Sequence, residues 1–120
     1  MIDVIATEYF LRELKQLAKR HRSIKADVRK LEDRLKENPL EGTDIGRNMR
    51  KLRMAISSKH QAKSGGARVI THVIVEVEDT TVRLLMIYDK SDKGSLSEGE
   101  LRELLQEKRL AVAANGGAGH

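Results

Sequence analysis

Apolar residues recur at helical spacing in two stretches near the N-terminus. The first stretch contains Phe10, Leu14 and Leu17, and the second contains Ile24, Val28, Leu31 and Leu35. This spacing places each set on one face of an α-helix. Thr7 and Ser23 can cap the two helices, and Asn38-Pro39 ends the second one. The pattern predicts an αα-hairpin, preceded by a short strand over residues 1–6.

Three later stretches have the β-branched or alternating residues typical of strands, at 49–56, 67–77 and 82–88. Residues 40–48 contain two glycines and are predicted to form a loop. Pairing Val77 with Val82 places Glu76 opposite Arg83, a cross-strand charge pair that favours this register.

A third helix is signalled near the C-terminus. Ser97 and Glu100 match the S-x-x-E capping box, and Leu96 and Leu101 stand at the two positions of a hydrophobic staple. The element order is therefore β-α-α-β-β-β-α. It predicts an α+β sandwich, with helices against one face of a small, mostly antiparallel sheet.

Basic residues are concentrated in the middle of the chain. Seven of them lie in a stretch without acidic residues: Arg47, Arg50, Lys51, Arg53, Lys59, Lys63 and Arg68, with His60 as a further candidate. The chain has 23 Lys and Arg against 18 Asp and Glu, so 23 less these seven leaves 16 against 18. Such a local excess predicts a site for phosphate or nucleic acid, although a basic run can also be a solvated edge.

The length of 120 residues fits one domain, predicted over residues 1–110, with a Gly- and Ala-rich tail over 111–120. The three aromatic residues are too few for a protein that stacks single-stranded bases on rings. There is no apolar run of membrane-spanning length, and Asp3 and Glu8 interrupt any signal-peptide pattern, so a cytoplasmic location is expected.

Metal chemistry is not expected from this sequence. The absence of cysteine excludes disulfides, zinc-thiolate sites and cysteine nucleophiles. The four histidines show no ligand spacing, and the basic stretch holds no carboxylate. We expect no metal ion and no cofactor.

The order of elements and three short segments carry a resemblance to a known family. The segments are Arg50-Lys51-Leu52-Arg53, residues 63–70 (KSGGARVI) and residues 87–91 (IYDKS). Over residues 1–108 the chain resembles the RelE/ParE toxin superfamily, and within it the RelE and HigB toxins that cleave messenger RNA. The resemblance implies an enzyme that enters the ribosomal A site, cuts the message and is silenced by a cognate antitoxin protein.

The resemblance also implies catalytic residues. Lys51 and Arg53 match the basic pair on the second strand, Arg68 matches the arginine that opens the third, and Lys90 matches a basic group after the fourth. Some members have a tyrosine near the C-terminus, for which Tyr88 is the candidate substitute. The register above puts Lys90 on the sheet face opposite Arg68, so a bulge or the strand's end must reconcile them.

The remaining basic residues are candidates for holding the RNA backbone: Arg47, Arg50, Lys59, His60 and Lys63. For Lys59 and Lys63 the alternative is plain solubility. His72 shares a strand face with Arg68 by alternation and could act as acid or base, but a strand histidine is more often structural.

Metal-free RNA cleavage requires a base for the ribose 2′-OH, stabilisation of the phosphorane charge and a proton for the 5′-oxygen. Arg and Lys suit the second task. Lys51 can serve as the base if Arg50 and Arg53 depress its pKa.

Two other functions remain open from sequence: a ParE-like inhibitor of DNA gyrase, and a non-catalytic RNA- or ribosome-binding module. The dense basic patch favours the nuclease over the gyrase inhibitor.

Overall fold

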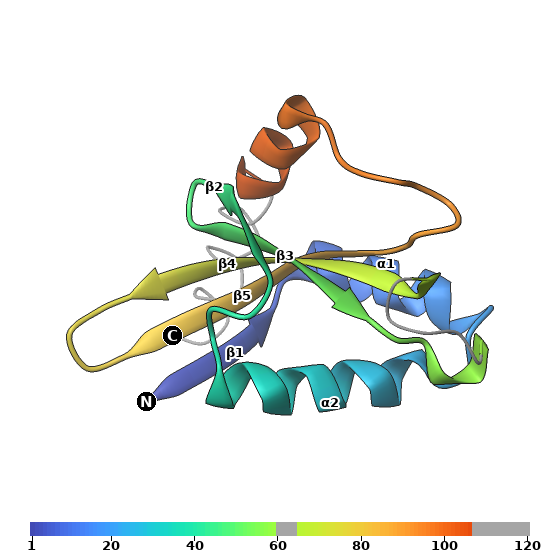
Figure 1. Ribbon diagram of the computed structural model, residues 1–120, viewed down its shortest axis with the longest axis horizontal. Helices are drawn as coiled ribbons and strands as arrows, with labels where there is room; N and C mark the ends of the chain where they lie inside the picture. The colour runs from blue at the N-terminus through green and yellow to red at the C-terminus, as the bar shows by residue number, and fades with distance from the viewer. Residues whose placement is uncertain (60–64, 107–120) are drawn as a thin grey trace.

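The computed structural model describes residues 1–59 and 65–106, which form an open sheet with helices on both sides (Figure 1). The strands are β1 (Ile2–Ala6), β2 (Thr43–Gly46), β3 (Met49–Met54), β4 (Ala67–Val75) and β5 (Thr80–Asp89). Their order across the sheet is β1-β5-β4-β3-β2. β1 runs parallel to β5, and the other pairs are antiparallel. The prediction of an α+β fold with a mostly antiparallel sheet is confirmed.

Two helices follow β1, as predicted: α1 (Glu8–Ala18) and α2 (Ile24–Glu37). Thr7 caps α1, because its hydroxyl accepts a hydrogen bond of 3.2 Å from the backbone N–H of Phe10. Ser23 precedes α2 but makes no side-chain cap; its hydroxyl donates to Asp27 at 2.8 Å and lies 3.0 Å from the Ser58 hydroxyl. The predicted capping role of Ser23 is therefore wrong: its backbone is in the αR conformation, and its hydroxyl accepts a hydrogen bond of 2.8 Å from the Ser58 N–H instead.

A further helix covers residues 98–106 and has the predicted capping box. The Glu100 N–H donates to the Ser97 hydroxyl at 3.1 Å, and the Ser97 N–H donates to the Glu100 carboxylate at 2.9 Å. Leu96 and Leu101 belong to the same apolar cluster, as a staple requires. Within the described ranges, no helix has the length and apolar character needed to cross a membrane.

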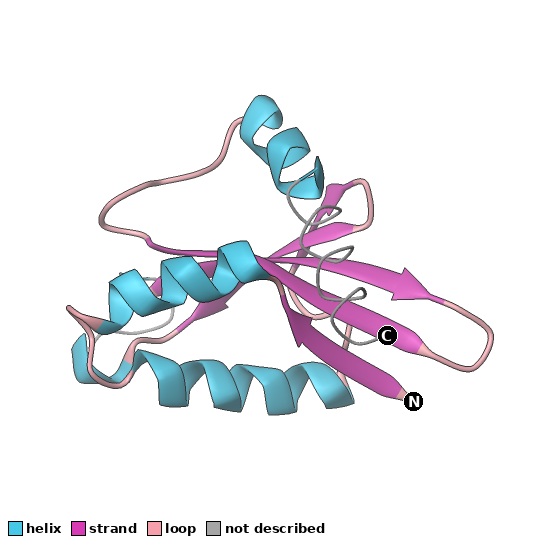
Figure 2. Cartoon of the chain, turned by 180° about the vertical axis from the view of Figure 1, so that it is seen from behind, coloured by secondary structure: helices cyan, strands magenta, loops and turns pink. Residues whose placement is uncertain are grey.

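Apolar side chains cover both faces of the sheet. On one face, α1 and α2 pack against residues that include Leu52 and Val69. On the other, the helix over 98–106 packs Leu101 against Ile70. Figure 2 shows the N-terminal helices and this last helix on opposite sides of the sheet. The prediction that the helices share one face is wrong, because β4 buries consecutive residues and so needs cover on both sides.

Residues 43–46 form an edge strand where the sequence predicts a loop. β2 joins β3 through Arg47 and Asn48, whose φ angles are 56° and 62°. Two successive positive φ angles give a two-residue turn whose twist suits antiparallel strands. The pattern does not reveal β2, because Ile45 is its one apolar residue.

The β4–β5 hairpin has a different register from the predicted one. Val75 pairs with Thr80 and His72 with Arg83, so Glu76 lies in the turn rather than opposite Arg83. The Glu76 N–H donates to the carbonyl of Asp79 at 2.8 Å and closes this turn. One surface charge pair contributes too little to override a turn of this kind.

β5 contains a bulge at Leu85. Ile70 pairs with Met86 and Thr71 pairs with Leu84, so Leu85 is an extra residue on β5. Leu85 is buried in the cluster beneath the last helix. A single extra residue reverses the alternation of side chains beyond it.

Gly66 lies against the end of β3. A Cβ at Gly66 would stand 2.3 Å from the carbonyl oxygen of Met54 and 3.1 Å from the Cα of Ala55. The Gly66 carbonyl also accepts a hydrogen bond from the backbone N–H of Lys90 at 3.0 Å. The absence of a side chain at Gly66 therefore lets this residue lie directly against the β3 backbone.

We expect Gly66→Ala to destabilise the fold by about 2 kcal/mol, since the added methyl group would force β3 and β4 apart. Gly94→Ala is the matched control, because a Cβ at Gly94 meets no atom within 4 Å. Urea unfolding of both variants measures the difference. Equal stability of the two variants would show that the Gly66 contact is unimportant.

Candidate functional site

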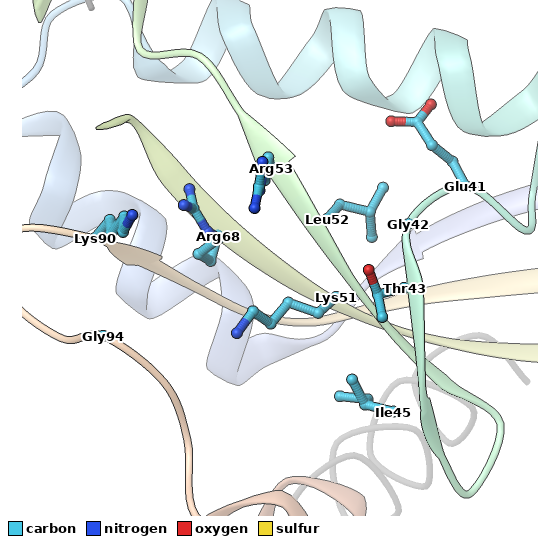
Figure 3. A pocket seen from close by; sticks show the side chains of 10 residues that line it. All are labelled: Glu41, Gly42, Thr43, Ile45, Lys51, Leu52, Arg53, Arg68, Lys90 and Gly94. Carbon is cyan, nitrogen blue, oxygen red and sulfur yellow. The ribbon is translucent and has the colours of Figure 1, made fainter. Parts of the chain in front are cut away.

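A cleft of about 770 Å³ opens between the basic side chains of β3 and β4 and the segment that leads into β2. Its lining consists of Glu41, Gly42, Thr43, Ile45, Lys51, Leu52, Arg53, Arg68, Lys90 and Gly94. Figure 3 shows the cationic side chains on one side, and the β2 residues with the segment before them on the other. The four residues that the resemblance singled out as cationic catalytic candidates therefore meet in one place.

Strands β3 and β4 and the residue that follows β5 supply these cations. Lys51 and Arg53 alternate on β3, and Arg53 pairs directly with Arg68 of β4. Because of the bulge in β5, Arg68 pairs with Tyr88, so Lys90 falls on the side of Arg68. The bulge thus resolves the conflict in the predicted register, and both Arg68 and Lys90 line the cleft.

Three of the four cations in the cleft have no structural partner in the described residues. Lys51, Arg53 and Lys90 make no side-chain hydrogen bond or ion pair with any residue among 1–59 and 65–106. Arg53 and Arg68 stand directly opposite each other, and like charges in that position are destabilising. The one carboxylate in the lining, Glu41, is held by Arg34 with contacts of 2.8 and 3.2 Å. Such an arrangement favours a bound anion.

Gly42 shapes the opposite wall of the cleft. Its φ is 100°, and a Cβ there would lie 2.6 Å from the carbonyl oxygen of Lys51. Arg50 lies on the other face of β3 and donates to the Gly42 carbonyl at 3.1 Å. Arg50 therefore holds the segment before β2 and is not part of the cleft lining.

Two further predicted RNA-binding residues, Arg47 and Lys59, lie outside the cleft. Arg47 is in the β2–β3 turn and pairs with Glu98 at 3.2 Å. Lys59 ends the short 3-10 helix η1 (Ser57–Lys59) and pairs with Asp89 at 3.2 Å. His60 and Lys63 lie outside the described residues.

Tyr88 lies in the sheet rather than in the cleft lining. Its side chain is 5% exposed, and its hydroxyl has no hydrogen-bond partner among the described residues. Burial raises the pKa of Tyr88 above its ordinary value, although the charges of Arg68 and Lys93 oppose the shift. His72 shares the face of Arg68, as predicted, but pairs with Met49 and does not line the cleft.

Asp89 is the residue that sequence reasoning missed. It is 2% exposed and lies on the face of the sheet that α1 and α2 cover. There it accepts hydrogen bonds from Ser91 (2.6 and 2.9 Å) and Lys59 and contacts His21 at 2.8 Å. Burial alone would raise its pKa, but the hydrogen bonds from Ser91, Lys59 and His21 hold the pKa of Asp89 well below its usual range. The available signal was Asp-x-Ser, a pattern typical of a side-chain-closed turn.

Among residues 1–59 and 65–106, no three His, Asp or Glu side chains are grouped so that they could hold a metal ion. A comparison with protein-family models finds no match, and a comparison with curated proteins finds none either. The functional argument therefore rests on the geometry of the cleft and on the resemblance carried by the three sequence segments.

Replacing Asp89 by Asn is expected to lower stability by about 3 kcal/mol at neutral pH, because Lys59 and His21 lose a buried ionised partner. A carboxyl with a depressed folded pKa stabilises the fold above its unfolded pKa of about 3.9, and loses that effect as pH falls further. The difference between wild type and Asp89→Asn should therefore be full above about pH 5 and shrink below pH 4. Urea unfolding at several pH values measures it.

The matched control is Asp92→Asn, at an exposed carboxylate paired with Arg20. We expect it to leave the free energy of unfolding nearly unchanged. A pH-independent difference for Asp89→Asn would contradict an ionised Asp89 in the fold.

Tyr88→Phe should stabilise the protein by about 1 kcal/mol, because it removes a buried hydroxyl that has no partner in the described chain. Tyr9→Phe is the matched control, since Tyr9 is only half-buried and its hydroxyl is not a buried unpartnered group, so its loss should give no gain. Thermal unfolding compares the two. A loss of stability in Tyr88→Phe would show that its hydroxyl has a partner.

Proposed function

We propose that this protein is an endoribonuclease that cuts messenger RNA on the ribosome, as RelE and HigB toxins do. The observation that supports this most is the convergence of Lys51, Arg53, Arg68 and Lys90 on one cleft. The sequence resemblance over residues 1–108 supports the same reaction. It also supports a cognate antitoxin as protein partner and the cytoplasm as the place of action.

Arg53 and Arg68 are proposed to hold the scissile phosphate. A guanidinium can donate two parallel hydrogen bonds to phosphate oxygens, which gives both strength and orientation. Fixed positive charge also stabilises the extra negative charge of the phosphorane. Their direct pairing across β3 and β4, with both residues lining the cleft, supports this role.

The lysines are proposed to exchange protons with the substrate. Arginine is not deprotonated in proteins, so among the four cations only Lys51 and Lys90 can take or give a proton. Lys51 lies within β3 and Lys90 directly follows β5, and Figure 3 shows both of them near Arg53 and Arg68. This suits a reaction in which one group accepts the 2′-OH proton and another protonates the 5′-oxygen. In this proposal side-chain cations stabilise charge that a metal ion stabilises in many nucleases.

Lys51→Ala and Arg53→Ala are each expected to reduce cleavage about 100-fold, since each removes a charge that acts on the transition state. Neither side chain holds a partner in the described structure, so the fold should be unaffected. The measurement is the mapping of 5′ ends of a message on a programmed ribosome. Lys30→Ala, at an exposed position of α2, is the control and should cleave normally.

Wild-type cuts within the A-site codon support the proposal, and full cleavage by Lys51→Ala would remove Lys51 from the mechanism. An intact message with inhibited supercoiling by gyrase would instead identify a ParE-like inhibitor. Ribosome binding with neither effect would identify a non-catalytic module.

A further inference from the structure

A second basic hollow, of about 450 Å³, lies at the turn between α1 and α2. Lys19, Arg20, His21 and Arg22 line it from the turn, and Ser58 and Lys59 line it from η1. It shares no lining residue with the cleft. The hollow thus brings four Lys and Arg residues from two separate parts of the chain to one surface.

The hollow and the cleft flank the same short segment at the end of β5. Asp89 reaches toward the hollow, where it pairs with Lys59 and His21. The next residue, Lys90, lines the cleft. Asp92 pairs with Arg20 at 2.6 Å and ties the segment to the α1–α2 turn. One extended polyanion could therefore contact both basic surfaces by crossing residues 89–92.

Part of the charge in the hollow is already neutralised, and part is not. Asp89 and Asp92 partner Lys59, His21 and Arg20, whereas Lys19 and Arg22 are exposed and have no side-chain partner among the described residues. The charge of Asp89 is offset by Lys59, and that of Asp92 by Arg20. The two unpartnered cations give the hollow its net attraction.

Helix stabilisation does not explain Arg22. A cation favours the C-terminal end of a helix and disfavours the N-terminal end. Arg22 stands immediately before Ser23, the residue that precedes α2, and is therefore close to the positive end of that helix. Its charge opposes the dipole of α2, so that helix gains no stability from Arg22.

We propose that this hollow is a second phosphate-binding subsite, which takes the backbone of the same RNA strand that enters the cleft. The inference rests on the proposed function of the cleft. The lining has no aromatic ring on which a base could stack, so the contact would be with phosphates and independent of sequence.

The test uses the full chain and labelled oligouridines of about 4 and about 16 nucleotides, lengths that bracket typical single-strand sites. Lys19→Ala/Arg22→Ala should bind the short oligomer as wild type does. It should bind the long one roughly tenfold more weakly, with the salt slope of log K reduced by about 1.4 for two lost contacts. Fluorescence anisotropy over a salt series measures both.

Arg29→Ala/Lys30→Ala removes the same charge from exposed positions of α2 and is the matched control. If the hollow variant matches this control on the long oligomer, the second subsite is overturned while the cleft proposal stands. If Arg53→Ala affects neither oligomer but the hollow variant weakens the long one, the hollow binds RNA and the phosphate-holding role proposed for the cleft fails. An equal loss of binding to a polyglutamate of similar charge would overturn the assignment to RNA.

Discussion

The extra residue in β5, Leu85, decides which side chains can act together. Without it, continuous pairing from His72 and Arg83 would place Lys90 on the face opposite Arg68. With it, Arg68 pairs with Tyr88 and Lys90 follows on the cleft side. Leu85 is held in place because it is buried beneath the helix over 98–106. The position of Lys90 in the cleft thus depends on the packing of Leu85 against the helix over 98–106, although that helix contributes no residue to the cleft lining.

The same strand end organises charge on the opposite face. Ala67 pairs with Asp89, so Asp89 points to the side of α1 and α2 while Lys90 points to the cleft. Buried Asp89 joins the α1–α2 turn, η1 and β5 through His21 and Lys59. Removing one partner from this network would leave a buried charge unpaired, which destabilises the fold far more than the loss of a surface ion pair. The hollow and the cleft are consequently fixed to each other by two adjacent residues of opposite charge.

Much of this arrangement can be predicted from local sequence, because local interactions determine it. Helical periodicity located α1 and α2, and the capping box at Ser97 located the start of the last helix. The strand β2 was missed because a four-residue edge strand needs only a neighbour's backbone, not an apolar pattern. The bulge was missed because residues 82–88 are nearly all apolar, so they show no alternation whose break could be detected. Asp89 was missed because its partners are remote in sequence.

Separation of the two basic surfaces has a chemical consequence. Catalysis requires cations fixed within about 3 Å of the reacting phosphate, whereas affinity for a polyanion needs only charges near its backbone. Arg68 is buried on the central strand β4 and therefore has the fixed position that its proposed catalytic role needs. Lys19 and Arg22, exposed on a turn, meet only the second requirement. Under the proposed function, a chain with an overall charge of +5 would attract RNA over a broad surface and confine the reaction to the cleft.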